Sequence, residues 1–220
     1  SNAARYENES SFAKSSRPDK VGRSGDGVRG GREFFMLKTA QEILGRGDLS
    51  VLVFGPGLSR DHELIARTEG VRECRITDLG NFQESDAFVP FDAPGKFDVI
   101  VACEVAEHFQ RPREEFAHLL ACLKPGGLLI VSTNISDGGS LAKLTYPFIP
   151  GHVSYYSGSA MIAIAKQNGF QIDFRMPQCV LGEPGIRKRY ILFYEAPEIA
   201  TGIARFFAHV PYAYSEPLPT

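Results

Sequence analysis

A glycine-rich turn follows the first strongly apolar segment of the chain. The segment LSVLVF leads into Gly55, Pro56 and Gly57. Glycines let the backbone pass close beneath a ligand, and backbone N–H groups at a helix start can bind a carboxylate or phosphate. A tight strand-to-helix turn without a ligand has the same composition, so the turn alone marks only a candidate site.

An acid ends the next predicted strand, CRIT. Asp78 at this point can accept hydrogen bonds from both hydroxyls of an adenosine ribose, although a solvated or capping role is the alternative. The glycine-rich turn and this acid together indicate a cofactor that contains a nucleoside. Arg60 argues against a nicotinamide dinucleotide, because the GxGxxG fingerprint needs its third glycine there.

Strands and helices are predicted to alternate around these residues. Apolar runs predict strands, and apolar periodicity with Pro112 and Ser157 at helix starts predicts the helices between them. The last two strands, FQIDFRM and YILFYE, have no helix between them, which favours an antiparallel pair. We therefore predict an α/β fold: a doubly wound, mostly parallel, Rossmann-like sheet with a C-terminal antiparallel strand hairpin.

Length and composition fit one folded domain with loose ends. The chain has 220 residues, of which 43% are hydrophobic. We expect residues 1–31 to be a tag scar and flexible arm, 32–200 the domain, and 201–220 a C-terminal tail. The basic residues of the arm could meet an anionic group of a ligand, or the arm could be a free terminus.

Charge and cysteine patterns argue against several classes of protein. The net charge of -2 shows no basic excess for nucleic acid. The four cysteines form no CxxC and no paired Cys/His spacing, so we expect no metal site and no disulfide framework. No apolar run approaches the roughly 18 residues of a membrane span, and the N-terminus has no signal peptide. We expect a cytoplasmic protein without membrane partners; its oligomeric state stays open.

Four strings, in order, resemble the successive motifs of class I S-adenosylmethionine-dependent methyltransferases. They are VLVFGPG, ITDL, DAFVPFDAPGKFDVIVACEVAEHF and LKPGGLLIVST, and GHVSYYS resembles a segment common in the small-molecule branch of that family. The match spans about residues 51–170. The resemblance implies S-adenosylmethionine as cofactor, S-adenosylhomocysteine as product, and methyl transfer to a small-molecule acceptor such as a sugar or metabolite hydroxyl.

The resemblance also implies which positions hold the cofactor. The turn would pass under its methionine part, Asp78 would bind the ribose with Leu79 against the adenine, and residues 86–87 would lie near the adenine edge. Residues 103–104 would lie beneath the methionine and sulfonium. The implied cofactor-binding residues are Phe54, Gly55, Pro56, Gly57, Asp78, Leu79, Asp86, Ala87, Cys103 and Glu104.

Methyl transfer requires the acceptor atom to be held close to the methyl group of the cofactor, and it also requires a base if the acceptor is a hydroxyl. His152, in a loop that often faces the acceptor, is the first candidate base, with a structural or capping role as the alternative. Glu104 and His108 come next, although His108 is expected to hold its loop rather than to catalyse. Nearby aromatic residues predict either an acceptor pocket or core packing: Tyr146, Phe148, Tyr155 and Tyr156.

The chain departs from the family pattern in three places. Val53 stands where the family usually has an acid, and Ser59 stands where it often has a glycine. Only residues 79–85 separate Asp78 from Asp86, so either a crossover is shortened or one acid is misaligned. A catalytically degenerate binding or regulatory protein is therefore the main alternative. An oxidoreductase and a nucleic-acid methyltransferase are less favoured.

Overall fold

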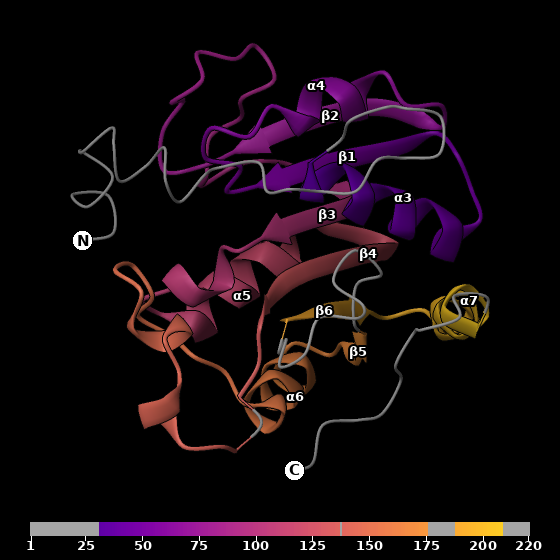
Figure 1. The fold of residues 1–220 in the computed structure, drawn as a ribbon. Coiled ribbons are helices and arrows are strands. Elements are labelled where there is room, and N and C mark those ends of the chain that lie inside the picture. The colour runs from indigo at the N-terminus through magenta and orange to yellow at the C-terminus, as the bar shows by residue number, and fades with distance from the viewer. Residues whose placement is uncertain (1–30, 137, 176–187, 209–220) are drawn as a thin grey trace.

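A computed structural model describes residues 31–136, 138–175 and 188–208 (Figure 1). The predicted N-terminal arm, apart from Gly31, lies outside the described residues, and so do residues 209–220 and the segment between the last two strands. Within the described part, no helix is both long and apolar enough to cross a membrane. The cytoplasmic location stays a prediction.

Six strands form one mixed sheet in the spatial order β2-β1-β3-β4-β6-β5. Strands β1 to β4 run parallel, β6 is antiparallel to β4, and β5 is antiparallel to β6. This arrangement confirms the predicted mostly parallel sheet with its C-terminal antiparallel pair. The strands are β1 Leu49–Phe54, β2 Val71–Thr77, β3 Phe97–Cys103, β4 Leu123–Asn134, β5 Gln171–Arg175 and β6 Lys188–Tyr194.

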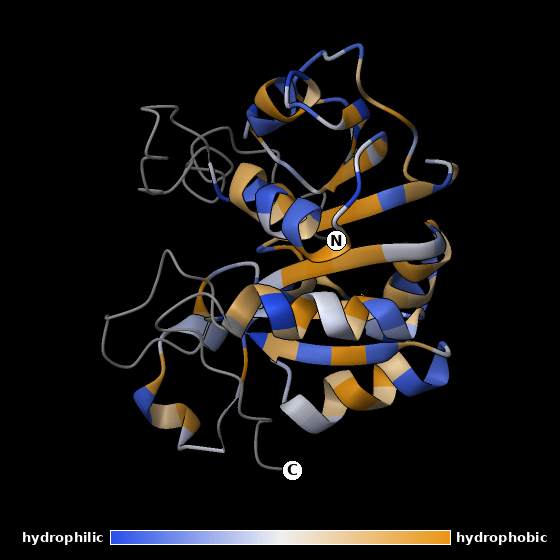
Figure 2. Cartoon of the chain, turned by 90° about the vertical axis from the view of Figure 1, so that its right-hand side faces the viewer, coloured by the Kyte–Doolittle hydropathy of each residue, from blue (hydrophilic) through white to orange (hydrophobic). Residues whose placement is uncertain are grey.

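Helices cover both faces of the sheet, as Figures 1 and 2 show. On β1, Val51 and Val53 pack with α3, α4 and α7, whereas Leu52 and Phe54 pack with α5 and α6. Strands buried on both faces read as continuous apolar runs, which explains why the sequence revealed them. The helices are α3 Arg32–Leu44, α4 Asp61–Ala66, α5 Pro112–Ala121, α6 Gly158–Gln167 and α7 Pro197–Ala208.

Local signals set the ends of two helices as predicted. Pro112 occupies the start of α5, where a missing N–H costs no hydrogen bond. Ser157 caps α6, since its Oγ accepts from the Ala160 N–H at 3.1 Å. The KPGG segment after α5 lies inside β4, where the register against β3 shifts between Phe97 and Val99.

The crossover from β2 to β3 is shortened. Between Thr77 and Phe97 the structure has no helix and no full strand, only a parallel bridge of Ile76 with Phe88. Ile76 donates its N–H to the Ala87 carbonyl at 3.0 Å and accepts from the Val89 N–H at 2.9 Å. One bridge therefore replaces an edge strand, and the short spacing after Asp78 is a real feature of this chain.

The folded domain extends past residue 200, where the sequence predicted a tail. Helix α7 continues to Ala208 and packs on α3, with Ile203 and Phe207 buried. Ile199, Ile203 and Phe207 repeat every four residues, which is the apolar stripe of a core-facing helix. The packing is close, because a Cβ on Gly202 would lie 2.1 Å from the Ile43 carbonyl oxygen.

We expect Gly202→Ala to lower the free energy of unfolding by about 1–3 kcal/mol, because the added methyl group must push α7 away from α3. Urea denaturation measures the loss. Thr201→Ala, on the exposed side of the same helix, is the control and should change stability by less than about 0.5 kcal/mol. Equal effects of the two substitutions would contradict the close packing of α7.

Candidate active site

The strand order reverses at β1, whose neighbours on the two sides are β2 and β3. Ligands of open α/β sheets bind at the carboxyl ends of the strands at such a point. The glycine turn leaves β1 here, with Gly55 and Gly57 at φ 67° and 58°. A Cβ on Gly55 would lie 2.7 Å from Val105, so a side chain is excluded by both conformation and space.

Asp78 holds the turn from the end of β2. One carboxylate oxygen accepts from the Gly57 N–H at 2.9 Å, and the other accepts from the Leu79 N–H at 2.7 Å. Burial raises the pKa of Asp78 above its ordinary value, although both backbone hydrogen bonds act against this. Leu79 beside it is 53% exposed, and the nearby Phe82 is also exposed. A half-buried acid next to exposed apolar side chains is chemically suited to a ribose and an adenine.

A side chain of the short crossover also contacts the glycine turn. Gln83 donates through Nε2 to the carbonyls of Gly57 at 2.8 Å and Ser59 at 2.9 Å. Of the two positions predicted near an adenine edge, Asp86 is exposed and Ala87 is half-buried against the core. The turn is therefore fixed from both sides, by Asp78 and by Gln83.

A polar network lies behind the turn, where the chain departs from the family pattern. Val53 is buried, and Ser59 donates through Oγ to Glu33 of α3 at 3.1 Å. Asp61 accepts the N–H groups of Gly31 and Phe34 at 2.7 and 3.0 Å. Burial, followed by the negative charge of Asp61, raises the pKa of Glu33 from 4.5 to about 8. Glu33 is therefore mostly protonated at neutral pH.

Glu104 follows β3 in a left-handed conformation with φ 54°, which is strained for a residue with a Cβ. Its carboxylate accepts from Ser132 Oγ at 2.9 Å and lies 3.6 Å from the Arg32 guanidinium of α3. Cys103, directly before it, is buried. The strained turn places Glu104 at the carboxyl edge of the sheet, one strand from the glycine turn.

A second cluster forms around Glu107, in the short 3-10 helix η1 (Ala106–His108) that follows. Glu107 is 1% exposed, and its carboxylate accepts from the Tyr146 hydroxyl at 2.6 Å. Its backbone carbonyl accepts the N–H groups of Val153 and Ser154 at 2.9 and 3.0 Å. Burial, with Glu107 and Glu104 nearby, raises the pKa of Tyr146 well above its usual range, so the phenol stays a donor.

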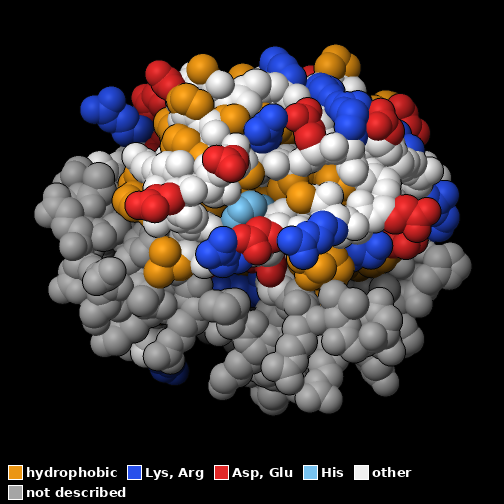
Figure 3. Space-filling view, turned by 90° about the horizontal axis from the view of Figure 1, so that it is seen from above, with side chains coloured by type: hydrophobic (Ala, Val, Ile, Leu, Met, Phe, Trp, Pro, Cys, Tyr) orange, Lys and Arg blue, Asp and Glu red, His pale blue; other side chains and the backbone are white. Residues whose placement is uncertain are grey.

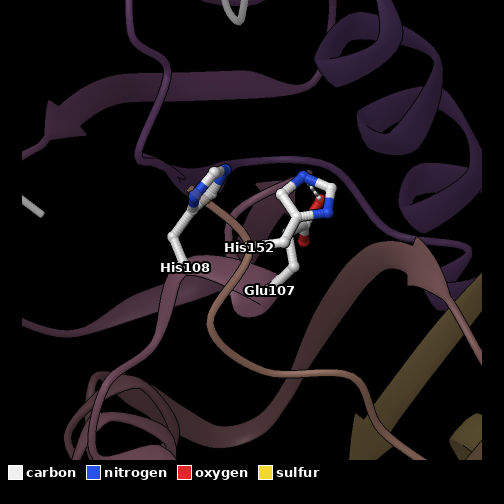
Figure 4. Close-up of side chains that lie close together, drawn as sticks. All are labelled: Glu107, His108 and His152. Atoms are coloured by element: carbon white, nitrogen blue, oxygen red, sulfur yellow. Dashed lines mark ion pairs between the residues drawn. The ribbon is translucent and has the colours of Figure 1, made fainter. Parts of the chain in front are cut away.

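Both candidate histidines belong to this cluster (Figure 4). His108 Nδ1 lies 2.9 Å from the Gly151 carbonyl, and His152 Nδ1 lies 2.7 Å from the Tyr146 carbonyl. His152 Nε2 lies 3.9 Å from a Glu107 carboxylate oxygen, and the two imidazole rings are 5.1 Å apart. The side chain of His152 is only 8% exposed.

The four aromatic residues singled out in the sequence differ in burial. Tyr156 is buried in the core against Phe116. Phe148 is 67% exposed, and Tyr155 lies beside Tyr146, with ring centroids 6.0 Å apart. Core packing therefore accounts for Tyr156, and an acceptor pocket formed by the others stays a prediction.

A family model for the methyltransferase domain matches residues 35–173, most of the described chain. The chain belongs to the class I S-adenosylmethionine-dependent methyltransferases. Its cofactor is S-adenosylmethionine, and methyl transfer yields S-adenosylhomocysteine. The half-buried Asp78 and the close passage of Gly55 fit this cofactor.

Solved structures of methyltransferases share the fold of this methyltransferase. The 1,6-didemethyltoxoflavin-N1-methyltransferase of Burkholderia thailandensis is 20% identical, with TM-score 0.50, over 74% of this chain and 77% of that one. The mitomycin 7-O-methyltransferase MmcR is 16% identical, with TM-score 0.57, over 74% of this chain and 53% of that one. The YcgJ protein of Bacillus subtilis is 21% identical, with TM-score 0.50, over 64% and 69%. At these identities the likeness shows the fold alone. No curated protein sequence matches the chain significantly.

Several residues of the candidate site were not predicted from the sequence. Glu107 stood within the EVAEH string, one position before a candidate histidine, but nothing local showed its burial. Tyr146 was noted only as an aromatic residue. Arg32, Glu33 and Gln83 gave no local signal, because their partners lie 26 or more positions away or in another element.

Stability should fall as the pH rises through the range set by Glu33. Between its ordinary pKa of 4.5 and about 8, the folded methyltransferase keeps a proton that the unfolded chain has released. The free energy of unfolding should drop by up to about 1.4 kcal/mol per pH unit in this range. Glu33→Gln should remove this slope, whereas Glu42→Gln, on an exposed position of α3, should retain it. Urea unfolding at several pH values measures both; an unchanged slope in Glu33→Gln would contradict the buried acid.

Replacing Asp78 by Asn should weaken S-adenosylhomocysteine binding by roughly 10–100-fold, since a hydrogen bond to a charged group contributes about 1.5–3 kcal/mol. Titration calorimetry measures the dissociation constant. Asp92→Asn, at an exposed position of the same crossover, is the matched control and should bind normally. Equal affinities for all three proteins would remove Asp78 from the cofactor site.

Proposed function

We propose that this methyltransferase transfers the methyl group of S-adenosylmethionine to an oxygen of a small-molecule acceptor. The observation that carries the proposal is that two clusters of polar residues lie at the same edge of the sheet. The glycine turn and Asp78 lie at the ends of β1 and β2, and Glu104 follows the neighbouring strand β3. The Glu107 cluster begins three residues after Glu104, on the side away from β2.

In this proposal the cofactor lies across the carboxyl ends of β1, β2 and β3. Residues 54–57 pass beneath the methionine part, Asp78 binds the ribose hydroxyls, and Leu79 lies against the adenine. Residues 86–87 border the adenine, and residues 103–104 lie beneath the methionine and sulfonium. The exposed apolar surface of Leu79, the excluded Cβ at Gly55 and the strained backbone of Glu104 support this placement.

The transfer itself is an in-line displacement at the methyl carbon. The carbon–sulfur bond breaks with its electron pair remaining on sulfur, a bond from the acceptor oxygen to the methyl carbon forms, and the hydroxyl proton leaves to a base or to water. The protein contributes mainly proximity and orientation. His152 is the first candidate base, and Glu104 and His108 are the next; the buried Glu107 carboxylate close to His152 would stabilise its protonated form.

The charge of the protein supports a small acceptor over nucleic acid. On the face seen in Figure 3, basic and acidic side chains of the described residues are interspersed among hydrophobic ones. A nucleic-acid site usually gathers positive charge on one surface. Two proteins that share the fold carry names of small-molecule methyltransferases, the mitomycin and didemethyltoxoflavin enzymes. The exposed Phe148 and the neighbouring Tyr155 could pack against such an acceptor.

Thermal shift with S-adenosylmethionine, S-adenosylhomocysteine, NAD and NADP in parallel is the first test. A ligand at 100 times its dissociation constant adds about 2.7 kcal/mol to the folded state. We expect a shift with the first two ligands and none with the dinucleotides. Release of S-adenosylhomocysteine, screened against phenols, sugars and amines, then tests the acceptor class. Cofactor binding without turnover on any acceptor would favour the catalytically degenerate binding protein.

His152→Ala should lower turnover by roughly 10²–10⁴-fold, the usual contribution of proton transfer by a side chain. Affinity for S-adenosylhomocysteine should stay unchanged, because His152 lies in the loop cluster and not on the glycine turn. Initial rates on the acceptor found in the screen, with calorimetry for the cofactor, separate the two quantities. An unchanged rate would eliminate a role of His152 in the reaction.

A further inference from the structure

We propose that Glu107, His108 and His152 form a binding site for a divalent transition-metal ion. Each side chain offers one ligand atom, and these atoms all lie within 4.8 Å of one another. Figure 4 shows the three side chains converging from two segments far apart in sequence, η1 and the loop that contains His152. Such a site was not predicted from the sequence, because the histidines and acids lack a metal-binding spacing.

The hydrogen bonds of both histidines favour this role. A carbonyl oxygen only accepts, so each Nδ1 that contacts a carbonyl must carry a proton: that of His108 at Gly151, and that of His152 at Tyr146. In the neutral imidazole, the lone pair then lies on Nε2. Metal-binding histidines almost always donate their second ring N–H to a carbonyl or carboxylate in this way, which fixes the ring and its tautomer.

Backbone contacts hold the two segments together without an ion. The Glu107 carbonyl accepts the N–H groups of Val153 and Ser154, and Ser154 Oγ donates to the Phe109 carbonyl at 2.7 Å. The Tyr146 hydroxyl fixes the Glu107 carboxylate at 2.6 Å. The ligand set is therefore preorganised, so binding an ion requires little ordering of the chain.

The donor types select the kind of ion. Two imidazoles and one carboxylate suit zinc, cobalt, iron(II) or manganese, whereas magnesium and calcium prefer oxygen ligands alone. Ligands about 2.0–2.2 Å from one ion lie at most roughly 4.4 Å apart. The 3.9 Å between His152 Nε2 and Glu107 Oε1 is within that span, and small side-chain rotations close the set around an ion.

Three protein ligands leave coordination positions for a further oxygen, as in catalytic rather than structural metal sites. On the proposed function, that oxygen belongs to the acceptor: the ion favours loss of the hydroxyl proton to water, and the oxygen then takes the methyl group while sulfur keeps the electron pair. His152 would then act as a ligand and not as the base, because its Nε2 lone pair is engaged. This part of the inference rests on the proposed function, whereas metal binding itself does not.

The test is metal binding by the chelator-treated full chain, without cofactor or acceptor. Cobalt(II) is the probe, since its visible absorption reports ligand type and coordination, and calorimetry with zinc and manganese gives affinities. We expect an absorption band typical of nitrogen and oxygen ligands and a raised melting temperature. The ligand variants Glu107→Gln, His108→Gln and His152→Gln should each weaken binding by at least about 10-fold, because even the loss of a residue that only orients a metal ligand typically costs that much.

His118→Gln is the matched control, because its Nε2 also contacts a carbonyl, that of Phe91, but it lies outside the cluster. It should bind cobalt like the unchanged protein. Melting curves in chelator identify any variant that fails to fold, and the remaining ligand variants then decide the question. Absence of a cobalt band and of any zinc or manganese binding would overturn the proposal, as would ligand variants that bind normally. Cofactor binding in the thermal-shift test would be unaffected by that failure.

Discussion

The buried carboxylate of Glu107 is the constraint on which the proposed acceptor side of the site depends. A carboxylate removed from water needs hydrogen-bond donors or a cation, because an unpaired buried charge costs several kcal/mol. Tyr146 supplies a hydroxyl and His152 lies close by, while the Glu107 carbonyl binds the same loop through the N–H groups of Val153 and Ser154. One residue thus joins η1 to a loop some forty positions later, and both candidate histidines take their places from this junction.

The cofactor side depends on a different constraint, the parallel arrangement of β1, β2 and β3. Parallel neighbours end at the same edge, so the glycine turn, Asp78 and Glu104 meet although they lie far apart in sequence. The departures from the family pattern are compensated locally. Ser59 finds a partner in the largely protonated Glu33, and Gln83 binds the turn from the shortened crossover. A protonated acid can lie against Asp61 without the full repulsion of two charges.

The shortened crossover also changes the surroundings of Asp78. A single bridge between Ile76 and Phe88 stands where an edge strand and helix would otherwise cover the end of β2. Leu79 and Phe82 are both exposed in this crossover. Apolar side chains next to the half-buried Asp78 are costly to leave in water, so a bound adenine would gain by covering them. The short connection thus leaves the proposed cofactor site open at this edge of the sheet, while Gln83 holds the glycine turn in place.

The elements and their order could be predicted from the sequence. Continuous apolar runs, Pro112, Ser157 and the glycine turn act over a few residues, and they indicated the doubly wound sheet with its antiparallel end. The methyltransferase family was indicated by the resemblance of four motif strings. Helix α7 was not predicted, since its apolar stripe near the C-terminus was taken for a tail, and the β2–β3 crossover was left open.

Which polar side chains meet depends on the tertiary fold. The partners of Glu33, Gln83 and Glu107 lie 24 to 47 positions away, and no local pattern encodes such pairs. Burial fixed the protonation of Glu33 and made Glu107 the centre of its cluster, because desolvation depends on everything packed around a group. Backbone preferences and hydrophobic periodicity are properties of short stretches of sequence. The environment of a charged side chain, in contrast, exists only once the chain has folded.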